Sequence, residues 1–284
     1  MPLSNPIHRF VLALSLTVLA MGGCATSPTG RSQLMLVSES QAIAASKTAY
    51  VETLQPFAKK GKLDNDPALK RRVERITARL VAQAVRMRPD TRDWEWSVAV
   101  IDDPKTVNAW CMAGGKMAIY TGLIQQLHPT DDELAQVMAH EIAHALAKHQ
   151  AEKMSVSMAS KLGVMAAGIV GAAVTDRPGM VVGGAAAAAL LAVELPNSRA
   201  AEAEADRIGI ELAAKAGYDP RAAVTLWEKM GALSGSRPPQ FLSTHPAPKN
   251  RKAALQALVP QMMRYYRAAK DPPSLPLHPP TLGG

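Results

Sequence analysis

Residues 129–150 read PTDDELAQVMAHEIAHALAKHQ, and this stretch decides the fold. Thr130 can cap a helix, and the three acids that follow it complement the positive end of the helix dipole. Apolar residues then recur at steps of three and four: Leu134, Val137, Met138, Ala145 and Leu146. Because no Pro or Gly follows Pro129, the stretch predicts a long helix packed into a core.

His140, Glu141 and His144 carry the chemistry of this helix. Residues four apart share a helix face, so both imidazoles can bind one metal ion at about 2.0–2.1 Å. Zinc lowers the pKa of a bound water to about 7, and Glu141 can take its proton and pass it to a leaving amine. By composition alone the five-residue pattern arises in on the order of one chain in a hundred, so it needs support from its context.

A zinc site of this kind needs a third protein ligand and an open fourth position. The metzincin spacing would place a third His at residue 150, where the chain has Gln150, and Ala147 replaces the expected glycine. His149 is one residue out of register, which favours a surface role or a role behind a ligand. The third ligand must therefore come from elsewhere.

The better candidates lie in the block from Ser198 to Asp206. Glu202 and Asp206 are four residues apart, so one can bind the metal while the other orients a ligand imidazole. Glu204 is two residues from Glu202 and points elsewhere. The alternative is that these acids form a solvated helix face.

The remaining periodicities predict an α+β protein that is predominantly α. Apolar spacing predicts helices over residues 38–57, 67–87, 197–216, 220–233 and 248–270, and alternation predicts strands over 93–102, 108–112 and 116–121. Residues 155–174 and 179–193, rich in small apolar residues, are predicted as buried or substrate-facing hairpin helices, with membrane contact as the alternative. The predicted catalytic domain spans 38–270, and 271–284 forms a Pro-rich flexible tail.

The N-terminus predicts export. An apolar run from Phe10 to Ala20 is too short for a bilayer of about 30 Å, and small residues lead to Cys24. Residues 1–23 are therefore predicted as a lipoprotein signal peptide, Cys24 as the lipidated residue and 24–37 as a tether, with an ordinary cleaved signal or an uncleaved anchor as alternatives. Ala25 favours the outer over the inner membrane, on its periplasmic face. A disulfide between Cys24 and Cys111 is the competing use of the two cysteines.

Composition narrows the function classes. The 284 residues are 48% hydrophobic and 20% charged, enough for one good-sized core or two small ones. A net charge of +8 is most simply a solvated basic surface, with anionic lipid as an alternative partner. Aromatic residues are only 4%, and no basic run contains them, so no nucleic-acid partner is expected.

Several short motifs together resemble one known family. They are Thr29-Gly30-Arg31, Asn108-Ala109 through Gly114-Gly115, Thr121-Gly122-Leu123, His140 to His144, Ser198 to Asp206, and Ser243-Thr244-His245-Pro246 followed by Arg251. The chain is similar in these to the zinc endopeptidases that include the CAAX prenyl protease, the heat-shock protease HtpX and the mitochondrial Oma-type enzymes. The resemblance implies a minimal gluzincin domain of the zincin fold, with a small antiparallel-type sheet packed on the metal-binding helix. Exported lipoproteins of outer-membrane protein quality control look most similar.

The resemblance also implies roles for residues outside the helix. Glu202 would be the third ligand of one zinc ion per chain, and Asp206 would support the first histidine. His245 has three possible roles: an oxyanion donor, a removable fourth zinc ligand that blocks the site, or a structural loop residue. Arg251 would pair with a carboxylate of the site or cap the fold.

The strand around Asn108, Ala109, Trp110, Cys111 and Met112 should bind substrate. An extended peptide can pair antiparallel with its edge, which gives affinity without strict sequence preference. Where the family more usually has aliphatic residues and a proline, this chain has Trp110 to Ala113, which bears on substrate preference. The predicted function is degradation of unfolded or misassembled envelope proteins. The alternatives are a zinc-binding chaperone or assembly lipoprotein, and a hydrolase of peptidoglycan crosslinks.

Overall fold

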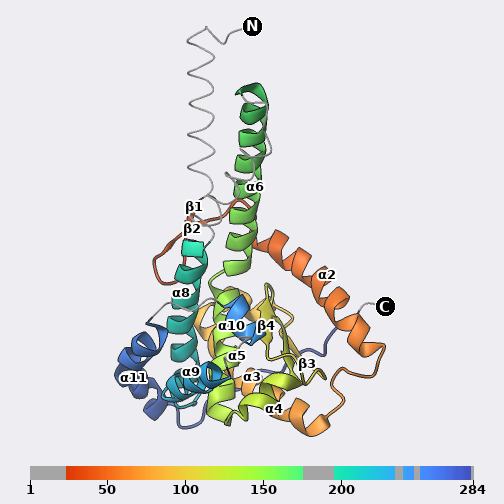
Figure 1. The fold of residues 1–284 in the computed structure, drawn as a ribbon. Helices are drawn as coiled ribbons and strands as arrows, with labels where there is room; N and C mark the ends of the chain where they lie inside the picture. Colours follow the sequence, from red (N-terminus) through yellow and green to blue (C-terminus); the bar gives the residue numbers. More distant parts are fainter. Residues whose placement is uncertain (1–23, 175–194, 234–238, 246–249, 283–284) are drawn as a thin grey trace.

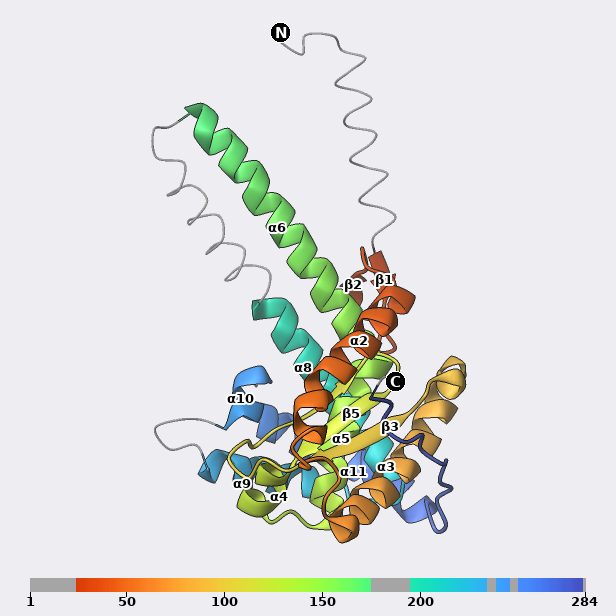
Figure 2. The same cartoon turned by 90° about the vertical axis from the view of Figure 1, so that its right-hand side faces the viewer.

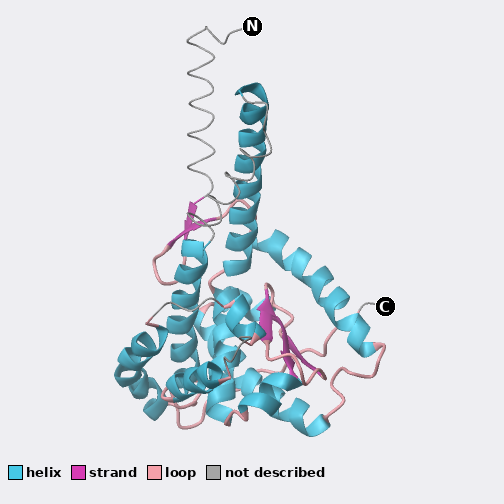
Figure 3. Ribbon diagram, in the orientation of Figure 1, coloured by secondary structure: helices cyan, strands magenta, loops and turns pink. Residues whose placement is uncertain are grey.

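The computed structural model describes residues 24–174, 195–233, 239–245 and 250–282. These residues form a mainly helical body with two small sheets (Figures 1 and 3). The α+β, predominantly α class predicted from periodicity is confirmed.

The predicted metal-binding helix is α5 (Asp131–Leu146), and it runs through the centre of the core. Thr130 and Glu133 form a capping box: the Thr130 hydroxyl accepts from the Glu133 backbone N–H, and the Glu133 carboxylate accepts from that of Thr130. Nearly every side chain of α5 is buried, including the polar residues His140 and Glu141. The helix is therefore held rigidly from all sides.

Three helices pack against α5, and a fourth packs against two of these three. They are α3 (Pro67–Met87), which begins after its cap Asp66, α8 (Leu195–Lys215), α9 (Ala222–Ala232) and α11 (Arg251–Ala268). Their bounds agree with the sequence predictions within two or three residues. Two short helices were not delimited in advance: α4 (Thr121–Leu127) and α10 (Gln240–Thr244).

A three-stranded sheet covers another side of α5. Its strands are β3 (Ser97–Ile101), β4 (Ala109–Met112) and β5 (Lys116–Tyr120), in the order β3-β5-β4. β4 and β5 form an antiparallel hairpin, in which Gly114 and Gly115 take φ of +81° and +77°. β5 runs parallel to β3, so the expectation of an antiparallel-type sheet is wrong for this pair. After β3, the chain skips one strand position and forms β4 in the opposite direction. The hairpin then places β5 between β4 and β3, so that β5 runs parallel to β3.

The segment predicted as a tether has structure of its own. β1 (Cys24–Thr26) and β2 (Ser32–Leu34) form an antiparallel hairpin that lies beside α6 (Figures 1 and 2). α2 (Glu39–Ala58) follows, with Ser38 as its cap. Gln33 is buried, because its side chain bonds to groups of the body rather than to water. Residues 24–34 are therefore part of the fold.

The predicted Pro-rich tail is extended and follows the body. The backbone N–H of Leu275 donates to the carbonyl of Ala78 at 3.1 Å, and that of His278 donates to the carbonyl of Trp96 at 2.7 Å. Leu275 and Leu277 pack against the main core. The tail thus covers α3 and the start of β3.

α6 (His149–Val174) leads away from the body (Figure 2). Residues 155–174 were predicted as a buried or substrate-facing helix, and the buried alternative is wrong at Met158, Leu162 and Met165, which are 49%, 54% and 65% exposed. Contact with substrate or membrane stays a prediction. Residues 179–193, predicted as the partner helix, lie outside the described residues. Within the described part of the chain, none of the helices combines the length and apolar character that a membrane span requires.

Candidate metal centre

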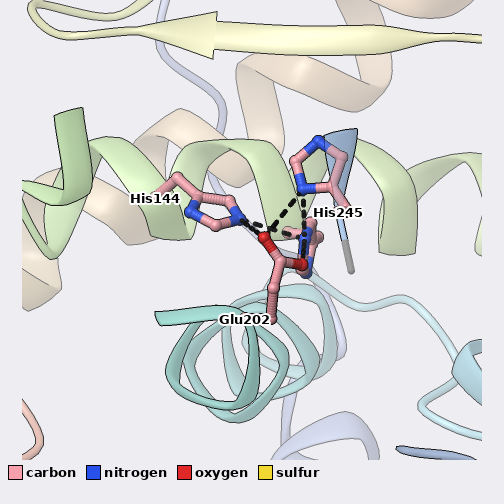
Figure 4. A group of neighbouring side chains, drawn as sticks. His144, Glu202 and His245 are labelled. Carbon is pink, nitrogen blue, oxygen red and sulfur yellow. Dashed lines mark hydrogen bonds and ion pairs between the residues drawn. The ribbon is translucent and has the colours of Figure 1, made fainter. Parts of the chain in front are cut away.

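The close approach of α8 to α5 brings the predicted ligands together. A Cβ on Gly209 would lie 3.0 Å from the backbone N of His140, a tighter approach than most side chains make, so glycine favours close contact of the two helices there. Glu202 lies seven residues before Gly209 and therefore on the same face of α8. The carboxylate of Glu202 consequently faces the imidazoles of α5, as Figure 4 shows for His144.

Four side chains converge on one point (Figure 4). Nε2 of His140 lies 3.1 Å from Nε2 of His144, and each nitrogen lies 3.3 Å from an oxygen of Glu202. His245 adds Nδ1, 3.1 Å from Oε1 of Glu202 and 3.4 Å from Nε2 of His140. The ligand atoms of all four residues lie within 4.8 Å of one another. We call these four residues the metal cluster.

His245 reaches this cluster from the end of α10. Its backbone N–H donates to the carbonyl of Phe241 at 2.9 Å, and its ring stacks on the Phe241 ring with centroids 4.5 Å apart. Phe241 is buried, and its own N–H donates to the carbonyl of Val107 in the loop before β4. The ring of His245 is thus fixed by packing, although the loop that follows it lies outside the described residues.

The spacing of the cluster fits a tetrahedral cation. Bonds of about 2.0–2.1 Å to a central zinc ion place neighbouring ligand atoms roughly 3.3 Å apart. Five separations between ligand atoms, 3.1–3.4 Å, are close to such an edge, with Glu202 contributing both of its oxygens, and one ligand atom from each of the four residues lies within 4.8 Å of the others. Two nitrogens and a carboxylate are also the donor types that zinc prefers. The residues therefore fit one zinc ion.

The electrostatics of the cluster attract positive charge. Burial lowers the pKa of His140, but hydrogen bonds to Asp206 and Glu202 outweigh it and raise the pKa to about 9. Burial would raise the pKa of Glu202, but hydrogen bonds from His140, His144 and His245 hold it far below its usual value. Burial lowers the pKa of His144 well below normal, which leaves its ring neutral, as a metal ligand must be.

Glu141 lies beside the cluster and does not belong to it. Its carboxylate is buried, and its Oε1 accepts no hydrogen bond from the described residues, with Nε2 of His245 as a neighbour at 3.4 Å. Burial raises the pKa of Glu141, while the nearby His245 and His140 oppose the rise. A buried carboxylate with a free oxygen and a raised pKa is suited to accept a proton.

Asp206 and Arg251 lie behind His140. Oδ1 of Asp206 is 3.1 Å from Nδ1 of His140, the ring nitrogen that faces away from the cluster. Nη2 of Arg251 donates to the same Oδ1 at 2.6 Å and lies 3.4 Å from Glu202. The guanidinium also stacks on the ring of Trp227, 3.6 Å from its centroid. Arg251 therefore pairs with site carboxylates, one of the two roles expected for it.

The predicted substrate strand, β4, is an edge of its sheet. Its pairing with β5 turns the backbone groups of Asn108, Trp110 and Met112 inward, so those of Ala109 and Cys111 point to the free edge. Side chains already bond to both ends of this edge. The Gln150 amide donates to the Cys111 carbonyl at 3.2 Å and accepts from the Ala113 N–H, and the Ala109 N–H donates to Oδ1 of Asn108 at 3.0 Å.

The two cysteines lie in different environments and are not bonded to each other. Cys111 is buried in β4, where burial raises the pKa of its thiol well above normal, and Cys24 is exposed in β1. No disulfide joins them, so that competing use is wrong.

Sequence reasoning did not connect the polar residues behind His144, although a role behind a ligand, one of the two considered for His149, agrees with their contact. Its Nδ1 lies 2.8 Å from Nδ1 of His149, whose Nε2 lies 3.1 Å from Oε2 of Glu204. Thr29 and Arg31 donate to the same carboxylate. His149 had two open roles, and Glu204 was expected only to point away from the cluster. The motif Thr29-Gly30-Arg31 was the signal available, but a sequence cannot show that it reaches α8.

Comparison with known proteins places this site in a family. Residues 67–259 match the model for peptidase family M48, a range that includes His140, Glu141, His144, Glu202, Asp206, His245 and Arg251. The chain is 33% identical over 254 residues to "Metalloendopeptidase OMA1, mitochondrial" of Bos taurus, covering 86% of this chain and 47% of that protein. It is 39% identical over 160 residues to "Mitochondrial metalloendopeptidase OMA1" of Arabidopsis thaliana, covering 56% of this chain and 31% of that protein.

A bacterial relative matches at a similar level. The "Beta-barrel assembly-enhancing protease" of Escherichia coli is 31% identical over 219 residues, covering 75% of this chain and 43% of that protein. The chain thus spans about a third to a half of the length of these relatives. Since the family model covers most of the chain, the protein belongs to peptidase family M48. Its domain is that of a metalloendopeptidase with a site for one zinc ion.

Proposed function

We propose that this protein is a zinc-dependent endopeptidase that degrades unfolded or misassembled proteins of the cell envelope. The observation that carries the proposal is the convergence of His140, His144 and Glu202 on one point, with the free carboxylate oxygen of Glu141 beside it. These three candidate ligands come from two helices, and they lie close together only because α8 packs against α5.

The residues of the chain divide the work of peptide hydrolysis. His140, His144 and Glu202 would hold zinc, which supplies a Lewis acid that polarises the scissile carbonyl. Glu141 takes a proton from the attacking water and delivers it to the leaving amine. Asp206 accepts a hydrogen bond from Nδ1 of His140 and keeps Nε2 directed at the metal.

The free edge of β4 supports an extended substrate. Ala109 and Cys111 turn their backbone groups outward, and the side chains of Asn108 and Gln150 already bond to the Ala109 N–H and the Cys111 carbonyl in the way a peptide group would. Backbone pairing needs an extended chain, which folded proteins rarely offer. This favours unfolded clients, and the protein should cleave denatured casein much faster than a native globular protein.

For His245, the geometry favours the fourth ligand among the three roles considered. Its Nδ1 lies at a corner of the cluster, where a removable ligand would block access to the metal. If His245 has this role, His245→Ala should raise the rate of casein cleavage. A fall of about a hundredfold or more would instead indicate an oxyanion donor.

Zinc content and casein cleavage, measured with and without chelator, test the proposal. Wild type should hold one zinc per chain and lose cleavage with the chelator. Glu141→Gln should keep the zinc and lose at least about a hundredfold in rate, because it removes only the base. Wild-type protein that holds zinc and protects clients without cutting them would favour the chaperone alternative, and cleavage of muropeptides alone would favour the peptidoglycan alternative.

The location is a separate proposal. Exposure of Cys24 in β1, together with the apolar run and small residues that precede it in the sequence, supports lipidation there, with the protein on the periplasmic face of the outer membrane. Mass spectrometry of the mature N-terminus should find Cys24 as the first residue, carrying lipid. An unmodified Cys24, or a chain that begins elsewhere, would contradict it.

A further inference from the structure

A second polar cluster lies on the far side of His144 from the metal cluster. Arg31 is at its centre: Nε donates to Glu204 at 2.8 Å, and the two terminal nitrogens donate to both oxygens of Glu152 at 2.6 Å. Both carboxylates are buried. Gln33 also donates to Glu152, at 2.8 Å, and to the carbonyl of Ala147 at the end of α5. We call Arg31, Glu152, Glu204, His149 and Gln33 the arginine cluster.

The turn after α5 connects the arginine cluster to His144. Lys148 takes a left-handed φ of +59°, which ends α5 and lets α6 begin at His149. The buried ring of His149 then faces back to His144, with the two Nδ1 atoms 2.8 Å apart. The left-handed turn is thus what lets a residue outside α5 reach a ring within it.

If His144 binds zinc through Nε2, only one assignment of donors and acceptors satisfies the hydrogen bonds from His144 through His149 to Glu204. A neutral His144 must then carry its proton on Nδ1 and donate it to Nδ1 of His149. His149 in turn carries its proton on Nε2 and donates to Glu204, 3.1 Å away. Glu204 is held for this role by Thr29, which donates at 2.6 Å, and by Arg31.

We propose that the β1–β2 hairpin is a working part of the metal centre, in which Thr29 and Arg31, through Glu204 and His149, position the zinc ligand His144. The inference rests on the proposed zinc site. The hairpin precedes residues 67–259, the part that matches the family model. His149, Glu204 and Arg31 are positioning residues, because they act through His144 and do not touch the metal.

The rate of zinc release from the full-length protein tests this proposal. Zinc-loaded protein is mixed with excess chromophoric chelator, and its melting temperature is measured in parallel. Loss of a group that orients a ligand typically lowers metal affinity by about 10–100-fold. Glu204→Gln and His149→Ala should each release zinc about 10-fold faster or more, and Arg31→Gln a few-fold faster.

The matched control is Glu211→Gln, the same substitution on the same helix at a residue that pairs with Lys215 on the surface. It should release zinc at the wild-type rate. Because His149 and Glu204 act in series, the double variant should release zinc no faster than the faster single variant. A merely structural role would instead change the melting temperature without changing the rate of zinc release.

Two results would overturn the proposal, and they differ. If Glu204→Gln and His149→Ala lower the melting temperature but release zinc at the wild-type rate, the hairpin only stabilises the fold and the zinc site stands. If wild type itself retains no zinc, the metal centre fails, and the role of the hairpin fails with it.

Discussion

The metal cluster and the arginine cluster lie on opposite sides of His144 and use the same residue types, yet they differ in charge balance. In the arginine cluster, a guanidinium lies between Glu152 and Glu204, so a cation of the chain itself neutralises the carboxylates. In the metal cluster, three imidazoles turn their nitrogens toward one another and toward Glu202, while the Arg251 guanidinium pairs closely with Asp206 at 2.6 Å and lies 3.4 Å from Glu202. The first arrangement is complete as folded, and the second gains most from a divalent ion.

Removing the metal should have the largest effect. Zinc binds the folded state, so free zinc at a thousand times its dissociation constant adds about 4 kcal/mol to the free energy of unfolding. A chelator should therefore lower the melting temperature of wild type sharply. The melting temperature of His144→Ala should hardly respond. A wild-type transition that ignores the chelator would contradict the assignment of the metal cluster.

Breaking the arginine cluster should destabilise the fold even without zinc. Arg31→Gln leaves two buried carboxylates without their cation, at a cost of about 2–3 kcal/mol after allowing for the partial exposure of Arg31. Denaturant unfolding of metal-free protein measures it. Arg221→Gln, which breaks the pair of an exposed Arg221 with Asp219, should cost much less. Equal costs for the two variants would show that the arginine cluster stabilises the fold no more than an exposed ion pair does.

The contact between α5 and α8 should matter to both clusters. Gly209→Ala forces the helices apart, because the new Cβ would lie 3.0 Å from the His140 backbone, at a cost of about 1–2 kcal/mol. Zinc affinity should fall as Glu202 moves away from the imidazoles. Gly231→Ala in α9 is the control, because its new Cβ would have none of the described residues within 4 Å beyond its own helix. Calorimetric zinc titration of both variants separates these outcomes.

The smallest of the four expected effects is the contribution of the lowered pKa of Glu204 to the pH dependence of stability. Burial would raise its pKa, but hydrogen bonds, first from His149 and then from Thr29 and Arg31, lower it below the ordinary 4.5. A lowered pKa in the folded state means that the stabilisation is full above about 4.5 and is lost as the pH falls below it. Between pH of about 5 and 3, wild type should lose roughly 1 kcal/mol more than Glu204→Gln. Parallel curves from denaturant titrations would contradict the paired state of Glu204.

Much of the fold follows from local patterns. The bounds of α5 follow from the capping box at Thr130 and the apolar spacing after it. Those of α3 follow from the cap Asp66 and the apolar spacing after it. These signals lie within one element, and helix formation depends on neighbours three and four residues apart. The strands were found by alternation, but their order was not, because register between strands depends on contacts distant in sequence.

The site divides in the same way. His140, Glu141 and His144 share one helix, so spacing alone fixed their common face. Glu202 and Asp206 were limited to a pair by their spacing, and resemblance assigned their roles. His149 and Glu204 could not be paired in advance, because their contact requires the left-handed turn at Lys148 and the packing of α8 on α5.

The sequence by itself determined one helix that places His140, Glu141 and His144 together and a second, acidic helix that carries Glu202 and Asp206. Only the tertiary structure decided that Arg31, from the N-terminal hairpin, reaches Glu204 behind the histidine ligand. The physical reason is range: helical spacing is set by backbone geometry within a few residues. A buried ion pair between residues 31 and 204 exists only when the whole core has brought them together.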